Sequence, residues 1–137
     1  MGSVATPGGY NDGMLGSYPI VAFVLTTDPA RARQFYGETL GLTFKGEDGH
    51  AVVFEAQGVL LRITIMREHK ASAHTVLGWN VPDVAAVVRE LSAAGVAFER
   101  YSFLPQDELG IWTTPDGSSK VAWFKDPDGN VLSVSQH

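Results

Sequence analysis

Apolar runs and helical repeats alternate along the chain from residue 18 onward, and this alternation predicts the order of its elements. Residues 20–25 are apolar without interruption, which is typical of a strand covered on both faces. Asp28 followed by Pro29 predicts a helix start, and apolar residues at helical spacing continue to Gly41, where the helix is expected to end. Three short strands are predicted next, at 42–45, 51–55 and 59–66.

The same order of elements returns in the second half of the chain. Residues 75–81 predict a strand, Asp83 predicts the start of a helix, and Gly95 predicts its end. The strands predicted after this helix are 96–101, 120–125 and 131–136. The pattern therefore predicts two modules, each a strand, a helix and three further strands.

Matching positions in the two modules locate an insertion. Asp28 and Asp83 are about 55 residues apart, whereas Phe54 and Phe124 are about 70 residues apart. The difference places roughly 15 extra residues within 103–118 of the second module.

A loop of this length is usually either a lid or a disordered excursion. The buried-type residues Leu109, Ile111 and Trp112 favour the lid. Residues 1–17 are rich in glycine and lack apolar periodicity, which predicts a flexible lead-in. The expected organisation is one domain over 18–137, with module one at 18–67 and module two at 74–137.

Composition narrows the class of protein. The chain has 137 residues, of which 45% are hydrophobic and 18% charged, as in an ordinary single globular domain. It has no cysteine, which excludes disulfides and thiolate chemistry. The formal net charge of −5 argues against nucleic acid as a partner. No apolar run approaches the roughly 20 residues that span a bilayer, and no signal-peptide pattern is present, so we expect a soluble, cytoplasmic protein without a membrane partner.

Two stretches of sequence carry a resemblance to a known family. The turn 126–130 (Asp-Pro-Asp-Gly-Asn) stands between Trp123-Phe124-Lys125 and Val131-Leu132-Ser133-Val134. The first helix region adds Asp28-Pro29, Phe35-Tyr36 and Leu40-Gly41-Leu42. Over 17–137 the chain resembles the vicinal oxygen chelate superfamily of glyoxalases, bleomycin-resistance proteins and extradiol dioxygenases. The resemblance implies an α+β fold in which two tandem βαβββ modules form a cup-shaped mixed sheet.

The resemblance also implies where a metal ion would be held. Metal-dependent members offer His, Gln or Glu ligands from the first and last strands of each module, and these positions correspond here to Val21, Arg62, Val76 and Ser133. None of the four is a usable ligand for a divalent ion, and a shift of one residue does not supply one. We therefore expect no metal and no other cofactor.

Strand alternation predicts which side chains line the cup. The residues in phase with the four positions are Val21, Phe23, Leu25, Arg62, Thr64, Val76, Gly78, Asn80, Ser133 and Ser135. This mixture of apolar walls and a few polar groups is typical of a small-molecule pocket. The predicted ligand-binding residues are Phe23, Arg62, Thr64, His74, Asn80, Tyr101, Trp112 and Ser133.

Arg62 has two interpretations. A guanidinium fixed in the cup would bind a carboxylate, phosphate or enolate oxygen. Alternatively, it reaches solvent at the rim or pairs with Glu55.

The histidines and tryptophans also leave alternatives. His69 and His74 are conceivable as a metal pair, but two histidines without a third ligand are more often solvated, and His74 is then a titratable group at the cup mouth. Tyr101 and Trp112 are expected to stack on a planar or cationic ligand, whereas Trp79 is expected in the core. The face taken by Trp123 stays open, and Asp126 and Asp128 are interpreted as turn formers.

Three functions follow from these residues. The first is binding of a small organic molecule, an antibiotic or a metabolite, in a metal-free cup. The second is a lyase, isomerase or dioxygenase that holds a divalent metal in an unfamiliar way, for example through His69 or His74. The third is an interaction module whose cup is filled by Phe23, Trp112 and Trp123. In each case the resemblance implies a homodimer.

Overall fold

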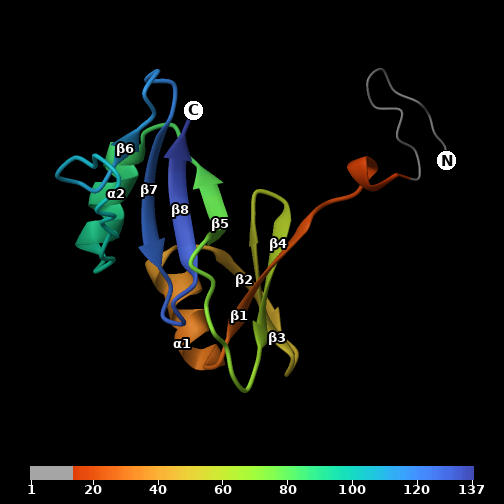
Figure 1. The fold of residues 1–137 in the computed structure, drawn as a ribbon. Helices are drawn as coiled ribbons and strands as arrows, with labels where there is room; N and C mark the ends of the chain where they lie inside the picture. Colours follow the sequence, from red (N-terminus) through yellow and green to blue (C-terminus); the bar gives the residue numbers. More distant parts are fainter. Residues whose placement is uncertain (1–13) are drawn as a thin grey trace.

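Each half of the chain forms a four-stranded sheet with a helix against one face, in a computed structural model that describes residues 14–137 (Figure 1). The strand order is β1-β4-β3-β2 in the first module, with β1 parallel to β4 and the other pairs antiparallel. A short 3₁₀ turn, η1 (Leu15–Ser17), precedes this module. Its elements are β1 (Val21–Thr26), α1 (Pro29–Arg33), the π-helical continuation η2 (Gln34–Thr39), β2 (Thr43–Glu47), β3 (Ala51–Ala56) and β4 (Val59–Ile65).

The second module repeats this topology. Its strand order is β5-β8-β7-β6, again with the first strand parallel to the last. Its elements are β5 (Thr75–Asn80), α2 (Val84–Ala93), β6 (Trp112–Thr113), β7 (Lys120–Lys125) and β8 (Val131–Gln136). The predicted α+β fold of two tandem modules is confirmed. None of the helices within residues 14–137 is long and apolar enough to cross a membrane.

The helix starts follow the predicted capping aspartates. The Asp28 carboxylate accepts a hydrogen bond from the Arg31 N–H, and the Asp83 carboxylate accepts one from the Ala86 N–H, each at 3.1 Å. These bonds satisfy backbone donors that have no partner inside a first helical turn. The lead-in predicted at 1–17 lies mostly outside the described residues.

The outer strand of the second sheet is not where the sequence predicted it. The predicted strand 96–101 contributes only an isolated bridge between Phe98 and Phe124, while β6 lies inside the predicted insertion 103–118. The cause is the turn 114–118, in which the Thr114 carbonyl accepts the Gly117 N–H and the Asp116 carboxylate accepts the Ser118 N–H. This turn directs residues 112–113 back along β7, so the hairpin takes the outer position.

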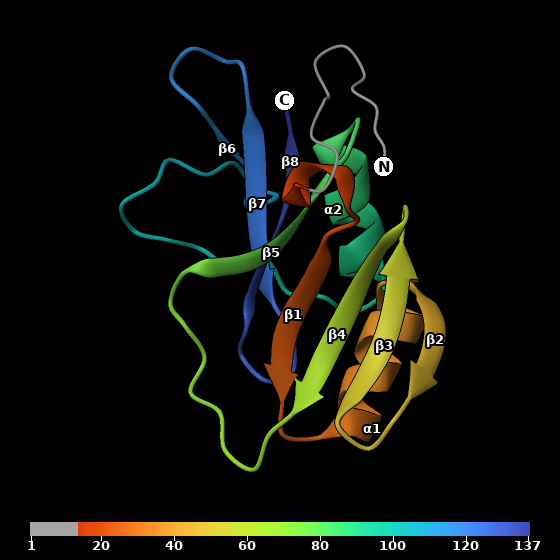
Figure 2. The same cartoon turned by 90° about the vertical axis from the view of Figure 1, so that its right-hand side faces the viewer.

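One apolar core spans both modules. Tyr36, Phe54 and Phe124 are fully buried, and Phe35 of η2 packs against both Tyr36 and Phe124, at 5.3 and 6.5 Å between ring centroids. The helix-facing sides of the two sheets therefore share their interior, and Figure 2 shows α1 behind the first sheet with its opposite face turned to the viewer. We call these opposite faces the helix-free faces.

The turn between β7 and β8 fastens the second module to the first. Asp126 is only 5% exposed, and its carboxylate accepts the Tyr36 O–H at 2.6 Å and the Asn130 side-chain N–H at 2.8 Å. The backbone N–H groups of Asp128 and Asn130 also donate to it. Burial, followed by the charge of Asp126, raises the pKa of Tyr36, so the phenol stays the donor. We call residues 126–130 the inter-module clamp.

Asp128 completes the clamp and gives it a pH dependence. Its carboxylate accepts the Thr26 O–H at 2.5 Å and the Thr27 N–H at 3.0 Å, and it pairs with the Arg31 guanidinium at 3.1 Å. Burial alone would raise the pKa of Asp128, but these hydrogen bonds and the Arg31 charge lower it below the ordinary value of 3.8.

A lowered pKa in the folded state means that the unfolded state takes up the proton first, so this contribution to stability is lost as the pH falls through about 4 and below. Asp128→Asn cannot titrate, and we expect it to be less stable than the wild type at neutral pH and to lose less stability on acidification. Urea unfolding at about pH 7 and about pH 3 measures both effects. Equal losses in the two proteins would contradict this account of Asp128.

Candidate functional site

The helix-free face of the first sheet presents an aromatic ring beside a guanidinium. Phe23 of β1 lies next to Arg62 of β4 in the parallel register, and Leu25 lies next to Thr64. Phe23 is 59% exposed, whereas its neighbour Val24, which faces the helix, is buried. The predicted alternation is confirmed for this pair of strands, and the face is open to solvent in a single chain.

Arg62 pairs with Asp48 rather than with Glu55. Its guanidinium donates to the Asp48 carboxylate at 3.2 Å, while Glu55 accepts the Gly58 N–H. Asp48 lies in the turn between β2 and β3, so the charge of Arg62 is partly balanced at the edge of the face. A guanidinium has five N–H donors, and this ion pair leaves others for a ligand oxygen.

Backbone N–H groups lower the pKa of Asp48 more than Arg62 does. The N–H groups of His50 and Ala51, followed by the Arg62 side chain, lower the pKa of Asp48 to about 2. We expect Arg62→Gln to raise this pKa but to leave it below the ordinary 3.8. A carbon NMR titration of the carboxyl group measures the change, and a return to 3.8 would show that the guanidinium is the main cause.

The helix-free face of the second sheet carries a group of aromatic rings. Trp123 of β7 contacts Trp112 of β6 at 6.4 Å and Tyr101 at 5.5 Å between ring centroids, and Tyr101 contacts the exposed Phe103 at 5.6 Å. We call these four residues the aromatic cluster. Trp123 lies directly beside Ser133 in the antiparallel register, which brings a hydroxyl to its edge. Burial and the charge of Glu99 raise the pKa of Tyr101.

Trp123 was the ring that the sequence left unassigned. Phe124 matches the buried Phe54 of the first module, and successive strand residues face opposite ways. This match is the signal that could have assigned Trp123 to the helix-free face.

The segment that carries Tyr101 and Trp112 is held by its own hydrogen bonds. The Gln106 side chain accepts the Tyr101 N–H at 2.7 Å and donates to the carbonyls of Glu99 and Gly110. The Arg100 guanidinium donates to the carbonyls of Asp107 and Glu108, each at 2.6 Å. Ile111 is buried in the core. The segment is therefore fixed against the second module rather than a disordered excursion, and lid motion stays a prediction.

Gly78 leaves room for the Ser133 side chain at the edge of the second sheet. It lies beside Ser133 in the parallel register, and a Cβ at this position would meet the Ser133 Oγ at 2.5 Å. Asn80, two residues further along β5, is exposed beside Ser135. The second sheet thus places a hydroxyl beside Trp123 of the aromatic cluster and an amide on its edge strand β5.

The two histidines have different surroundings. The His69 Nε2 lies 2.7 Å from the Asn130 Oδ1, and because the Asn130 amide donates to Leu25 and Asp126, its oxygen must be an acceptor. His69 Nε2 therefore carries a proton and serves the inter-module clamp. His74 is exposed just before β5, and its place at the mouth of a binding site stays a prediction.

The predicted ligand-binding residues fall into two groups. Phe23, Arg62 and Thr64 share the first sheet, whereas Asn80, Tyr101, Trp112 and Ser133 share the second, with His74 at its edge. The sheets meet along β1 and β5. One chain therefore presents two half-sites side by side.

The donor chemistry does not fit the metal ion that the family implies. The corresponding positions are Val21, Arg62, Val76 and Ser133, and the Arg62 guanidinium would repel a cation. Within residues 14–137 there is no group of three or more His, Asp or Glu side chains that could hold a metal ion.

Comparisons with known proteins agree on the fold. The family profile described as Glyoxalase/Bleomycin resistance protein/Dioxygenase superfamily matches residues 20–134. An integron cassette protein from the mobile metagenome of the Halifax Harbour sewage outfall superposes with a TM-score of 0.70 at 15% identity, covering 88% of this chain and 99% of that one. No curated protein matches the sequence.

Two further structures share the fold at similar identity. A lactoylglutathione lyase from Agrobacterium tumefaciens gives a TM-score of 0.67 at 17% identity, covering 88% of this chain and 93% of that one. A glyoxalase/bleomycin resistance protein/dioxygenase from Alicyclobacillus acidocaldarius gives 0.64 at 15% identity, covering 88% and 92%. Identities this low establish a shared fold and leave the chemistry to the residues of this chain.

Proposed function

Because the chain belongs to the glyoxalase/bleomycin resistance protein/dioxygenase superfamily, we propose that it binds a small organic molecule on its helix-free faces without a metal ion. The observation that carries the proposal is the aromatic cluster. Tyr101, Trp112 and Trp123 form a group of rings on the helix-free face of the second sheet. A sheet face that contacts only water usually carries polar side chains instead.

The polar groups around the rings favour a particular ligand. Arg62 retains N–H donors but has its charge balanced by Asp48, so it suits a carbonyl oxygen better than a free anion. Ser133 and Thr64 add hydroxyls on the two faces. We propose a planar molecule that stacks on the aromatic cluster and directs a carbonyl oxygen to Arg62.

We propose further that two copies pair to complete the cup. Val21, Phe23 and Val76 are 41%, 59% and 44% exposed, although each is a large apolar residue in the middle or at the start of a strand. Exposed apolar side chains on neighbouring strands are typical of a protein contact. The small molecule would lie between the first half-site of one copy and the second half-site of its partner. The predicted cytoplasmic location belongs to the same proposal.

Tryptophan substitutions test the binding site. Trp112→Ala removes a ring of the aromatic cluster, and we expect it to weaken binding of a planar ketone or quinone by about tenfold, the effect of losing one well-packed aromatic contact. Phe44→Ala, which removes a partly exposed ring on β2 away from the aromatic cluster, is the matched control and should bind as the wild type does. Calorimetric titration of both variants measures the affinities. Equal affinities in the wild type and Trp112→Ala would refute the assignment.

A further inference from the structure

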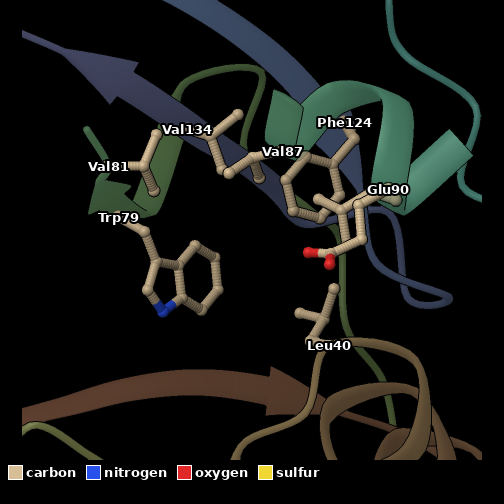
Figure 3. Close-up of a pocket in the computed structure, with 8 residues that line it drawn as sticks. Leu40, Trp79, Val81, Val87, Glu90, Phe124 and Val134 are labelled. Atoms are coloured by element: carbon tan, nitrogen blue, oxygen red, sulfur yellow. The ribbon is translucent and has the colours of Figure 1, made fainter. Parts of the chain in front are cut away.

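Two neighbouring cavities lie between the modules, lined mainly by residues from the helix-facing sides of the sheets. One has a volume of about 150 Å³ and is bounded by Leu40, Leu91, Phe124 and Trp79, with Glu90 at its wall (Figure 3). The other has a volume of about 290 Å³ and is bounded by residues of β1, β4 and β5, again including Trp79. Because they share Trp79, we treat them together and call them the inter-module groove.

The internal duplication explains why this space exists. The offset that matches Asp28 with Asp83 also matches Tyr36 with Leu91, and the offset that matches Phe54 with Phe124 matches Ala56 with Asp126. Tyr36 and Asp126 join the modules on one side. On the other side Leu91 has no hydroxyl and Ala56 has no carboxylate. The second half of a symmetric clamp is missing, and the groove occupies its place.

Trp79 stands in the middle of this gap. The offset that matches Asp28 with Asp83 also matches Trp79 with the buried Val24, so a large indole occupies the position of a small core residue. Trp79 is half-buried and stacks at 6.4 Å and 18° on Phe124. Among the described residues, no hydrogen bond is made by its indole N–H or by the side-chain amides of Gln57 and Asn80, which line the larger cavity. The groove therefore combines apolar walls with unused donors and acceptors.

Glu90 gives the groove a charge preference. Figure 3 shows its carboxylate turned toward the space bounded by Leu40 and Trp79. It forms no ion pair with any residue of 14–137. A carboxylate that faces an indole across an apolar space attracts a cation through its charge, and the ring quadrupole adds to this attraction.

We propose that the inter-module groove is a second ligand site, which takes a planar aromatic cation with its ring against Trp79 and its charge at Glu90. This site is distinct from the one under the proposed function, although Asn80 lines both. It uses a different tryptophan and a different charged residue, so the two can be tested independently.

The test uses the full chain and the planar aromatic cation proflavine, followed by the indole N–H signals of the three tryptophans in NMR spectra. Trp79→Phe assigns the Trp79 signal. We expect proflavine to shift that signal saturably, and a simultaneous shift of Trp112 or Trp123 would report additional stacking on the aromatic cluster without affecting this result. Fluorescein, a planar anion, should not shift it. A shift of Trp112 and Trp123 alone, or no saturable shift, would overturn the proposal.

A charge variant provides the second measurement. Glu90→Gln keeps the shape of an exposed helix residue, and we expect it to bind proflavine about tenfold more weakly, as for the loss of one ionic and cation–π contact. Glu38→Gln, an exposed glutamate on η2, is the matched control and should bind as the wild type does. Circular dichroism confirms that both variants fold. Equal affinity of Glu90→Gln and the wild type would overturn the role of Glu90.

Discussion

Asp126→Ala is expected to lower the free energy of unfolding by about 3 kcal/mol or more, because it removes the shared acceptor of several buried donors. The variant leaves the Tyr36 O–H, the Asn130 side-chain N–H and two backbone N–H groups without their partner. A buried donor that loses its acceptor costs about 1–3 kcal/mol. The bonds also join the two modules, so their loss weakens the common core. Urea unfolding followed by circular dichroism measures the change.

A second aspartate in a turn is the control for this prediction. Asp116 accepts hydrogen bonds from Thr114 and Ser118, but it is exposed and joins residues of one hairpin only. We expect Asp116→Ala to cost less than about 1 kcal/mol, as for other exposed turn residues. If both alanine variants lost the same amount of stability, Asp126 would be an ordinary turn residue, and the role of residues 126–130 in joining the modules would be contradicted.

Tyr36→Phe separates the hydroxyl from the rest of the network. The ring stays in the core beside Phe35 and Phe54, and only the bond to Asp126 is lost. We expect a loss of about 1–2 kcal/mol. The double variant with Asp126→Ala should lose less stability than the sum of the two single losses, since both substitutions remove the same bond. Additive losses would contradict the direct coupling.

Phe23→Asp is expected to raise the dissociation constant of the proposed dimer by about a hundredfold or more, because it places a charge in the middle of an apolar contact. The side chain is 59% exposed in a single chain, so the fold should be retained. Ala86→Asp, on the exposed side of α2, changes the net charge equally and is the control. Sedimentation velocity over a range of concentrations measures both. A wild-type protein that stays monomeric, or an unchanged dimer in Phe23→Asp, would contradict the pairing.

The hydrophobic period was enough to predict most of the fold, because each strand and helix carries its own local signal. The aspartate caps, the glycine stops and the repeated order of elements all depend on residues within a few positions of each other. The outer strand of the second sheet was misplaced because two segments compete for the same edge of β7. The turn at 114–118 decided this competition through hydrogen bonds that apolar periodicity does not reveal.

The candidate site was predictable only as far as strand alternation reaches. Alternation correctly oriented Phe23 and Arg62, and the match between Phe54 and Phe124 would have oriented Trp123. It could not identify Asp48 as the partner of Arg62, because that contact depends on the turn between β2 and β3.

The inter-module contacts were missed for a related reason. Asp126 has the sequence of a turn former, and its bond to Tyr36 joins residues 90 positions apart. No local pattern encodes such a contact, although the missing counterparts Leu91 and Ala56 can be found once the duplication is known.

Native mass spectrometry of the protein purified without chelator, combined with elemental analysis, shows whether the chain binds an organic molecule in the absence of metal. We expect a dimer that retains a small organic molecule and carries divalent metal only well below one ion per chain. Near-stoichiometric nickel, zinc, iron or manganese without an organic ligand would contradict it, and would favour a metal-dependent enzyme with ligands other than those at Val21, Arg62, Val76 and Ser133.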